Sequence, residues 1–259
     1  MSPQLVRPSQ TVQAKVTVPR PVENVVAATV EWGYTNFYDG AGGTDGDSWV
    51  GVSTDKPAIA VDRFLGAIST FRVPSRAPGS SEEIARWLCR VRVGRHRRDI
   101  TTEAEFDVQV GAADVAPAKA EVQRVDGAAD TVLDIALPWA VFGAGDTIRG
   151  HIKLTPSHDL PDGDLAMCWQ RERLSHPLNR PPSRAAPLNG PIIKLGNRIP
   201  LRSGAPVAVP FELALPVDAA PTASAMHSSL VYFVAARLHY AGSRSPERVR
   251  CPIVVVNAV

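Results

Sequence analysis

A basic run, Arg90-Val-Arg-Val-Gly-Arg-His-Arg-Arg98, is the densest cluster of charge in the chain. If the apolar side chains of the strand 89–93 face a core, its two arginines point to the opposite face and the remaining basic residues follow at a turn. Guanidinium groups match phosphate and carboxylate geometry, so this surface could bind an acidic or phosphorylated segment of another protein. A solvated hairpin tip is the plainer alternative, because runs of charge usually face water. The candidate binding residues are Arg90, Arg92, Arg95, His96, Arg97 and Arg98.

A second cluster is acidic and lies among glycines in residues 39–47. Its carboxylates suggest a calcium site, but the segment lacks the ligands at alternating positions and the closing glutamate of an EF-hand loop. Turn chemistry instead predicts a flexible loop that joins two strands. The candidate contact residues in and beside this loop are Asp39, Asp45, Asp47 and Trp49.

Signatures of catalysis and of metal binding are missing from the sequence. The six histidines show no HxH or HExxH spacing, and the serines lie in no GxSxG elbow. Cys89, Cys168 and Cys251 are far apart and sit in apolar runs, which is typical of small buried side chains in a reducing compartment. These observations predict a protein that is not an enzyme and that has no cofactor and no metal.

Composition bounds the class of protein and of partner. With 259 residues, 44% hydrophobic and 21% charged, the chain is expected to fold, and its length suits two sandwiches of roughly 110 to 140 residues. A formal net charge of +2 gives no general preference for nucleic acid or anionic membrane. No apolar run approaches the ~20 residues of a membrane helix, and no export signal is evident. We therefore expect a cytoplasmic protein without integral membrane association; its oligomeric state stays open.

The chain carries the same pattern twice. An apolar pair, a turn and a strict apolar alternation are followed further along by a proline-containing strand end and then by an aromatic strand. Two copies in the same order predict two similar domains in tandem. The matching stretches are 5–18 with 141–154, 71–78 with 213–221, and 87–93 with 232–238. Within the first pair, Val12, Ala14, Val16 and Val18 align with Ile148, Gly150, Ile152 and Leu154.

Nearly every segment is a short strand bounded by Pro, Gly, Asn or Asp, which predicts an all-β fold of two domains, residues 1–112 and 113–259. A hinge is expected near residues 111–116, and a surface crossover over the proline-rich residues 176–191. Only residues 80–88 could start a short helix. In one long strand, period two places Val26, Ala28, Val30, Trp32 and Tyr34 on the same face.

The second half resembles the arrestin-like superfamily, whose members pair two β-sandwich domains. Residues 145–154 match the strand that follows a turn in that family, residues 209–216 match its "pF-x-x-x-L-P" segment, and residues 232–238 match its "Y-x-V-x-A-x-L" strand. In the first half, residues 71–74 and 87–93 fit. Ser9-Gln10 and Ala14 stand where the second half has Gly145-Asp146 and Gly150.

The length and two-domain plan are similar to those of bacterial sporulation-control proteins of this superfamily. The resemblance implies tandem immunoglobulin-like or arrestin-like β-sandwiches packed side by side, acting as a non-catalytic adaptor or scaffold that binds other proteins. A role in bacterial development or stress regulation follows from the same resemblance. An exposed sheet edge is a further possible contact, because it can accept a partner strand. The alternatives are a cell-surface or secreted sandwich that binds a ligand such as carbohydrate, and a hydrolase whose triad assembles from distant loops.

Overall fold

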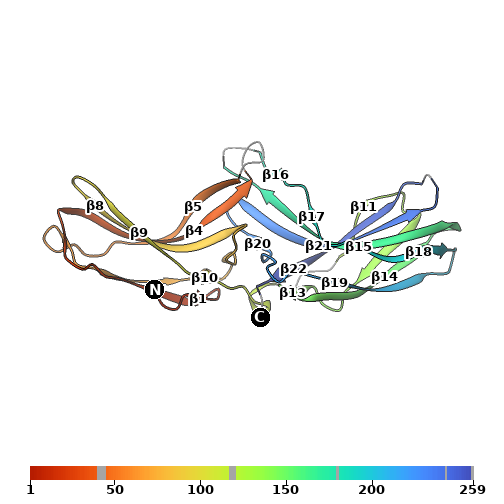
Figure 1. Cartoon of the computed structure of the whole chain (residues 1–259), viewed down its shortest axis with the longest axis horizontal. Coiled ribbons are helices and arrows are strands. Elements are labelled where there is room, and N and C mark those ends of the chain that lie inside the picture. The colour runs from red at the N-terminus through yellow and green to blue at the C-terminus, as the bar shows by residue number, and fades with distance from the viewer. Residues whose placement is uncertain (40–44, 117–120, 179–180, 243, 258–259) are drawn as a thin grey trace. The chain divides into compact units, whose positions relative to one another are not determined.

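The computed structural model describes residues 1–39, 45–116, 121–178, 181–242 and 244–257, and it confirms the all-β fold class (Figure 1). The chain divides into two compact units, which are described separately. Unit 1 comprises Met1–Asp114, Leu174–Ser183 and Ala223–Ser229, and unit 2 comprises Val115–Arg173, Arg184–Thr222 and Leu230–Val259. Two segments from the second half of the sequence therefore belong to unit 1.

Unit 1 is built on a four-stranded sheet of order β5-β4-β8-β9, together with the pairs β2-β7, β3-β6 and β1-β10. Trp32 of β4 stacks on Phe71 of β7 with 5.3 Å between ring centroids, and its indole N–H donates to Ser69 Oγ at 2.7 Å. The four-stranded sheet and the β2-β7 pair therefore share one aromatic core. The strands are β1 Leu5–Val6, β2 Thr11–Val16, β3 Val22–Glu23, β4 Val25–Asp39, β5 Asp45–Asp55, β6 Arg63–Phe64, β7 Ala67–Arg72, β8 Ala85–Arg95, β9 Ile100–Glu105 and β10 Asp107–Val108, followed by a short 3-10 helix, Ala112–Asp114.

The prediction that Val26 lies on the buried face of β4 is wrong, because a β-bulge shifts the strand at this point. The register between β4 and β8 shifts between Val25 and Ala27, so Val25 is buried while Val26 is 59% exposed. A bulge adds one residue to one strand, and it therefore moves every side chain before it to the other face. The other four members of the expected row, Ala28, Val30, Trp32 and Tyr34, are buried as predicted.

The segment Ala223–Ser229 is held in unit 1 by a buried amide. Asn36 of β4 is fully buried, and its Nδ2 donates to the Ile84 carbonyl at 2.9 Å and to Ser228 Oγ at 2.8 Å. Its Oδ1 accepts the His227 backbone N–H at 2.6 Å. Because an unpaired buried amide is costly, these bonds tie the segment to β4 specifically.

Unit 2 has a larger sheet of order β11-β22-β21-β15-β16, with β13 paired to β22 and β17 and β18 paired to β15, and a three-stranded sheet of order β12-β14-β19. Trp169 of β15 donates its indole N–H to the Ala214 carbonyl of β19 at 3.1 Å, so the two sheets again share a core. The strands are β11 Gln123–Asp126, β12 Thr131–Ala136, β13 Val141–Gly143, β14 Thr147–Pro156, β15 Leu160–Ser175, β16 Ser183–Arg184, β17 Leu188–Asn189, β18 Ile193–Leu201, β19 Val207–Ala214, β21 Ser228–Tyr240 and β22 Glu247–Val256. The short strand β20 Ala223–Ser224 and the first two residues of β21 lie in the segment that belongs to unit 1.

The repeated sequence pattern reappears as a repeated strand register. In unit 1 Val12 of β2 lies opposite Phe71 of β7, and in unit 2 Ile148 of β14 lies opposite Leu213 of β19. These are the residues that align in the two copies of the pattern. The matching stretches therefore pair in the same way in both units.

Two smaller expectations have a clear outcome. Residues 82–84 form a turn and no helix, because Ser81 bridges to Ala85 where β8 begins. In the proline-rich stretch, the described residues are largely exposed, as expected for a surface segment, but they also contribute the short strands β16 and β17 to the sheet of unit 2.

Candidate binding site

The basic run of unit 1 occupies the end of β8 and the turn to β9. Cys89, Val91 and Val93 are buried, so the prediction that Arg90 and Arg92 face away from the core is confirmed. The run ends in the turn formed by His96, Arg97 and Arg98, which are exposed and form no ion pair or hydrogen bond within the described part of the chain.

Arg90 is neutralised by its own sheet. Cross-strand register places it between Glu31 of β4 and Glu103 of β9, and its Nε donates to Glu103 Oε1 at 2.6 Å. Its guanidinium also lies 4.3 Å from the ring centroid of Trp49. Gly33 makes room for this ring, because a Cβ there would lie 2.9 Å from the indole. The structure therefore joins a member of the basic run to a residue from beside the acidic loop.

Arg92 and Arg95 are also engaged locally. Arg92 donates to Asp99 Oδ2 through Nε at 2.8 Å and through Nη2 at 2.5 Å, while Arg95 Nε donates to the Glu23 carbonyl at 3.2 Å. The hydrogen bond from Arg92, together with the Arg95 backbone N–H, holds the pKa of Asp99 below its usual value. The charge of Arg92 is therefore neutralised by Asp99, whereas Arg95 keeps its charge because its acceptor is a neutral carbonyl.

The acidic candidates lie in or beside the ends of two paired strands. β4 continues to Asp39 and β5 begins at Asp45, so only residues 40–44 separate the strands, and these lie outside the described residues. The Asp39 backbone N–H donates to Ser175 Oγ at 2.8 Å, whereas Asp45 and Asp47 are exposed. Within the described ranges, no three His, Cys, Asp or Glu side chains gather as a group that could hold a metal ion.

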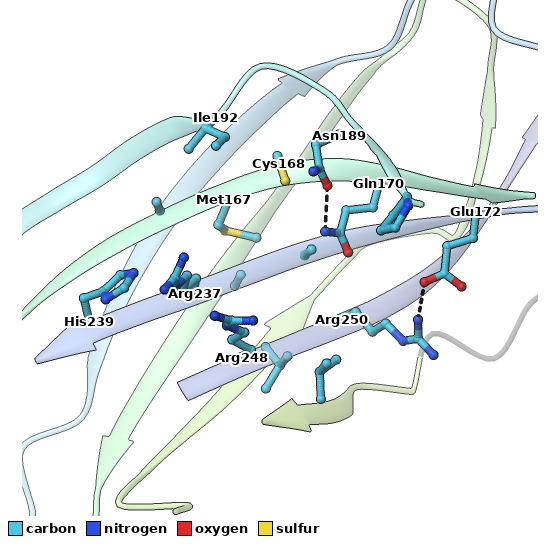
Figure 2. Close-up of a pocket in the computed structure, with 16 residues that line it drawn as sticks. Met167, Cys168, Gln170, Glu172, Asn189, Ile192, Arg237, His239, Arg248 and Arg250 are labelled. Carbon is cyan, nitrogen blue, oxygen red and sulfur yellow. Dashed lines mark hydrogen bonds and ion pairs between the residues drawn. The ribbon is translucent and has the colours of Figure 1, made fainter. Parts of the chain in front are cut away.

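Unit 2 contains a hollow that the sequence interpretation did not identify. It has a volume of about 590 Å³ and lies on β15, β21 and β22, with residues around β17 on its rim (Figure 2). Half-buried Ala166, Cys168 and Ala235 contribute an apolar floor. Burial raises the pKa of the Cys168 thiol, so this floor is uncharged at neutral pH.

Three arginines and one glutamate line this hollow, hereafter the arginine groove. At one end Glu172, which is buried, accepts a hydrogen bond from Arg250 Nη1 at 2.8 Å and forms an ion pair with Arg184 at 3.5 Å. The Arg250 guanidinium also stacks on Phe233 at 4.2 Å. Arg250 is therefore fixed and largely neutralised.

Arg237 and Arg248 have no such partner. They lie directly opposite each other on β21 and β22, on the same face of the sheet, and neither forms an ion pair with a carboxylate in the described structure. Asp126 lies opposite Arg248 on β11, but its carboxylate accepts the Gly127 N–H at 2.9 Å. Like charges directly opposite each other in a sheet are destabilising, so this pair costs the fold stability. An anion bound between the two guanidinium groups would remove that cost.

The pKa of His239 responds to the positive charge in the arginine groove. Its pKa lies below the usual value because of partial burial first, and then because of the positive charges of Arg237 and Arg248, against a weaker opposite effect of Asp164. The two arginines thus act on a neighbouring group at the rim. Figure 2 shows His239, Arg237 and Arg248 gathered on one side of the hollow, with Ile192 and Asn189 on the other.

A sequence signal for the arginine groove does exist. Arg237 and Arg248 each occupy the polar position of an alternating strand, and a short turn joins these strands. Alternation predicts that both side chains face outward, but the register that sets them opposite each other depends on the turn geometry. In the sequence, the compact run at residues 90–98 is denser in charge and therefore draws attention first.

Comparisons with known proteins add no family and no relative to these observations. No helix in the described ranges is long and apolar enough to cross a bilayer. A scan of family models finds no match to the chain, and a search of curated proteins finds no matching sequence.

Proposed function

We propose that this protein is a non-catalytic interaction module of arrestin-like type, built from two tandem β-sandwiches, and that its arginine groove binds an acidic segment of a partner protein. The observation that carries the proposal is the pair Arg237 and Arg248, which lie opposite each other without a carboxylate partner beside an apolar floor. Side-chain carboxylates of the partner would pair with the guanidinium groups, and its small apolar side chains would cover the floor.

The arrestin-like part of the proposal is supported by the duplication. The aligned stretches pair in the same register in both units, and in each unit a tryptophan donates its indole N–H to the opposing sheet. A place in bacterial development or stress regulation has only the sequence resemblance behind it.

Defined peptides test the binding function directly. A fluorescent peptide that alternates Glu with Ala or Val is compared with a matched peptide in which each Glu is Gln, using fluorescence anisotropy at low salt. The acidic peptide should bind and the Gln peptide should not, with binding weakened by added salt because the groove is solvent-accessible. The double variant Arg237→Ala, Arg248→Ala should lower the affinity about 100-fold or more, since it removes two contacts between charged groups, each of which contributes about 1.5–3 kcal/mol.

The matched control is the double variant Arg90→Ala, Arg92→Ala, which removes the same charge from the outer face of unit 1. It should keep the peptide affinity, because those arginines are already paired with Glu103 and Asp99. Equal binding of the acidic and Gln peptides, or a loss of binding in the control variant alone, would overturn the assignment of the arginine groove.

A further inference from the structure

Three aliphatic side chains project into solvent at one end of unit 1. Val61 is 91% exposed, Leu65 is 61% exposed, and Val26, in the bulge of β4, is 59% exposed. Val26 follows the buried Val25 and Leu65 follows the buried Phe64, whereas Val61 lies between the exposed residues Ala60 and Asp62. They therefore form separate apolar tips and no continuous apolar face.

Backbone contacts bring these tips close to the basic turn 95–98. The Val25 N–H donates to the Asp62 carbonyl at 2.9 Å, which places the turn around Val61 beside the β4 bulge. Glu23 of β3 pairs with Arg63 of β6, and its carbonyl accepts Arg95 Nε at 3.2 Å. The apolar tips and the basic turn therefore share one end of unit 1.

Valine is an unfavourable residue for the backbone conformation at position 61. Ala60 and Arg63 exchange both backbone hydrogen bonds, at 2.9 and 3.0 Å, and the two residues between them have φ of +45° and +59°. Such a two-residue turn strongly favours Asn-Gly, and a β-branched residue at positive φ is strained. A side chain that is both strained and almost fully hydrated adds nothing to the stability of the fold. Contact with something outside the chain would account for it.

The charge at this end is positive. Arg63 pairs with Glu23 and Arg92 with Asp99, so these four side chains cancel. Arg95 donates only to an uncharged carbonyl, and Arg97 and Arg98 are exposed without a partner in the described ranges. Against these three arginines stand Asp62, which adjoins Val61 in the turn, and Glu31, which lines the same hollow as Arg95, so the balance stays positive. An anionic surface complements this arrangement.

We propose that this end of unit 1 docks on an anionic lipid surface. Val61, Leu65 and Val26 would enter the boundary between headgroups and acyl chains, while Arg95, Arg97 and Arg98 contact lipid phosphates. Isolated aliphatic tips suit a fluid bilayer better than a protein partner, because a stable protein interface needs about 800 Å² of continuous contact on each side. The inference is independent of the arginine groove in unit 2.

Vesicle co-sedimentation tests this proposal with the whole chain. Vesicles of phosphatidylcholine alone are compared with vesicles in which about a third of the lipid is phosphatidylglycerol, at low and at physiological salt. We expect binding to the anionic vesicles only, weakened by salt. The variant Arg97→Ala, Arg98→Ala should lower the partition coefficient roughly 20- to 30-fold. The same charge removed from unit 2 by Arg124→Ala, Lys194→Ala, at exposed positions of β11 and β18, should leave it unchanged.

The variant Val61→Asn separates docking from folding. Asparagine is favoured at this turn position, so the thermal midpoint should stay the same or rise while vesicle binding falls several-fold. Val132→Asn, at a valine of unit 2 that is 57% exposed, is the control and should leave vesicle binding unchanged. The proposal is overturned by equal binding to both vesicle types, by no binding at low salt, or by full vesicle binding in Val61→Asn and in Arg97→Ala, Arg98→Ala. It is also overturned if only the unit 2 variants lose binding.

Discussion

Arginines lie on an outer sheet face in both units, but they are paired with carboxylates on one face and not on the other. On the β4-β8-β9 face of unit 1, Arg90 forms an ion pair with Glu103, and Arg92 forms a two-point contact with Asp99. On the β21-β22 face of unit 2, Arg237 and Arg248 lie opposite each other, and the only buried carboxylate of the groove, among the described lining residues, already serves Arg250 and Arg184. A dense run of charge in the sequence is thus self-neutralised, whereas two dispersed arginines remain available.

The difference shows why charge density in the sequence does not locate a binding surface. What matters is whether the fold supplies counter-charges from neighbouring strands, and this depends on cross-strand register. Glu103 and Asp99 follow the basic run closely in the sequence because β9 returns directly beside β8. The exception in unit 1 is the turn itself, where Arg97 and Arg98 extend beyond the strands that could neutralise them.

The largest expected effect comes from giving unit 2 the charge pattern of unit 1. Arg237→Glu places a carboxylate opposite Arg248, so the affinity for an acidic peptide should fall at least about 100-fold, since one charge-assisted contact is lost and a repulsion is added. The free energy of unfolding should rise by roughly 0.2–1 kcal/mol, because a like-charge pair becomes an opposite-charge pair. Anisotropy and denaturant unfolding measure the two effects. A variant that binds normally, or that is less stable than the parent, would contradict the comparison.

A second contrast concerns the position where the two copies of the pattern differ. A Cβ on Gly150 would lie 2.5 Å from the Ala136 carbonyl of β12 and 2.9 Å from the Phe211 ring. In the described part of unit 1, β2 forms a ladder with β7 and just a single bridge, from Gln13 to Ser2, on its other side, and it accepts Ala14. Gly150→Ala should therefore lower the free energy of unfolding by about 1–3 kcal/mol. Ala14→Gly should cost only about 0.5–1 kcal/mol, through backbone entropy. Denaturant unfolding of both variants measures these two losses of stability. Equal losses would contradict the explanation that the backbone of β12 leaves no room for a Cβ at residue 150.

How much the sequence could predict follows from the same features. Apolar alternation predicted the all-β class and the inward faces of β2, β8 and β14, because burial with period two is a local property of each strand. The bulge at Val26 could not be predicted, since it depends on how β4 pairs with β8. The basic run could be identified in the sequence, but its neutralisation could not, since it also depends on how the strands pair. The pair Arg237 and Arg248 was overlooked, although both residues occupy outward positions.

The smallest effects are shifts in two titrations, one on each face. Arg92→Ala should raise the pKa of Asp99 toward its ordinary 3.8, because the hydrogen bond from Arg92 is the main cause that lowers it. Arg248→Ala should raise the pKa of His239 toward 6.5 without reaching it, because burial, the first cause, remains. NMR titration of each side chain measures these changes, and an acidic peptide should shift His239 in the same upward direction and leave Asp99 unmoved.

Both shifts also make stability fall with acid, in separate windows of pH. The folded-state pKa of Asp99 is depressed, so its contribution is present above the unfolded value near 3.8 and is lost as the pH falls through the lower folded value. For His239 the unfolded chain takes up its proton first, so stability begins to decline as the pH falls below about 6.5. Arg248→Ala should weaken only the decline near pH 6.5, and Arg92→Ala only the one below pH 4. If either variant altered the other window, the two arginine faces would not be electrostatically independent.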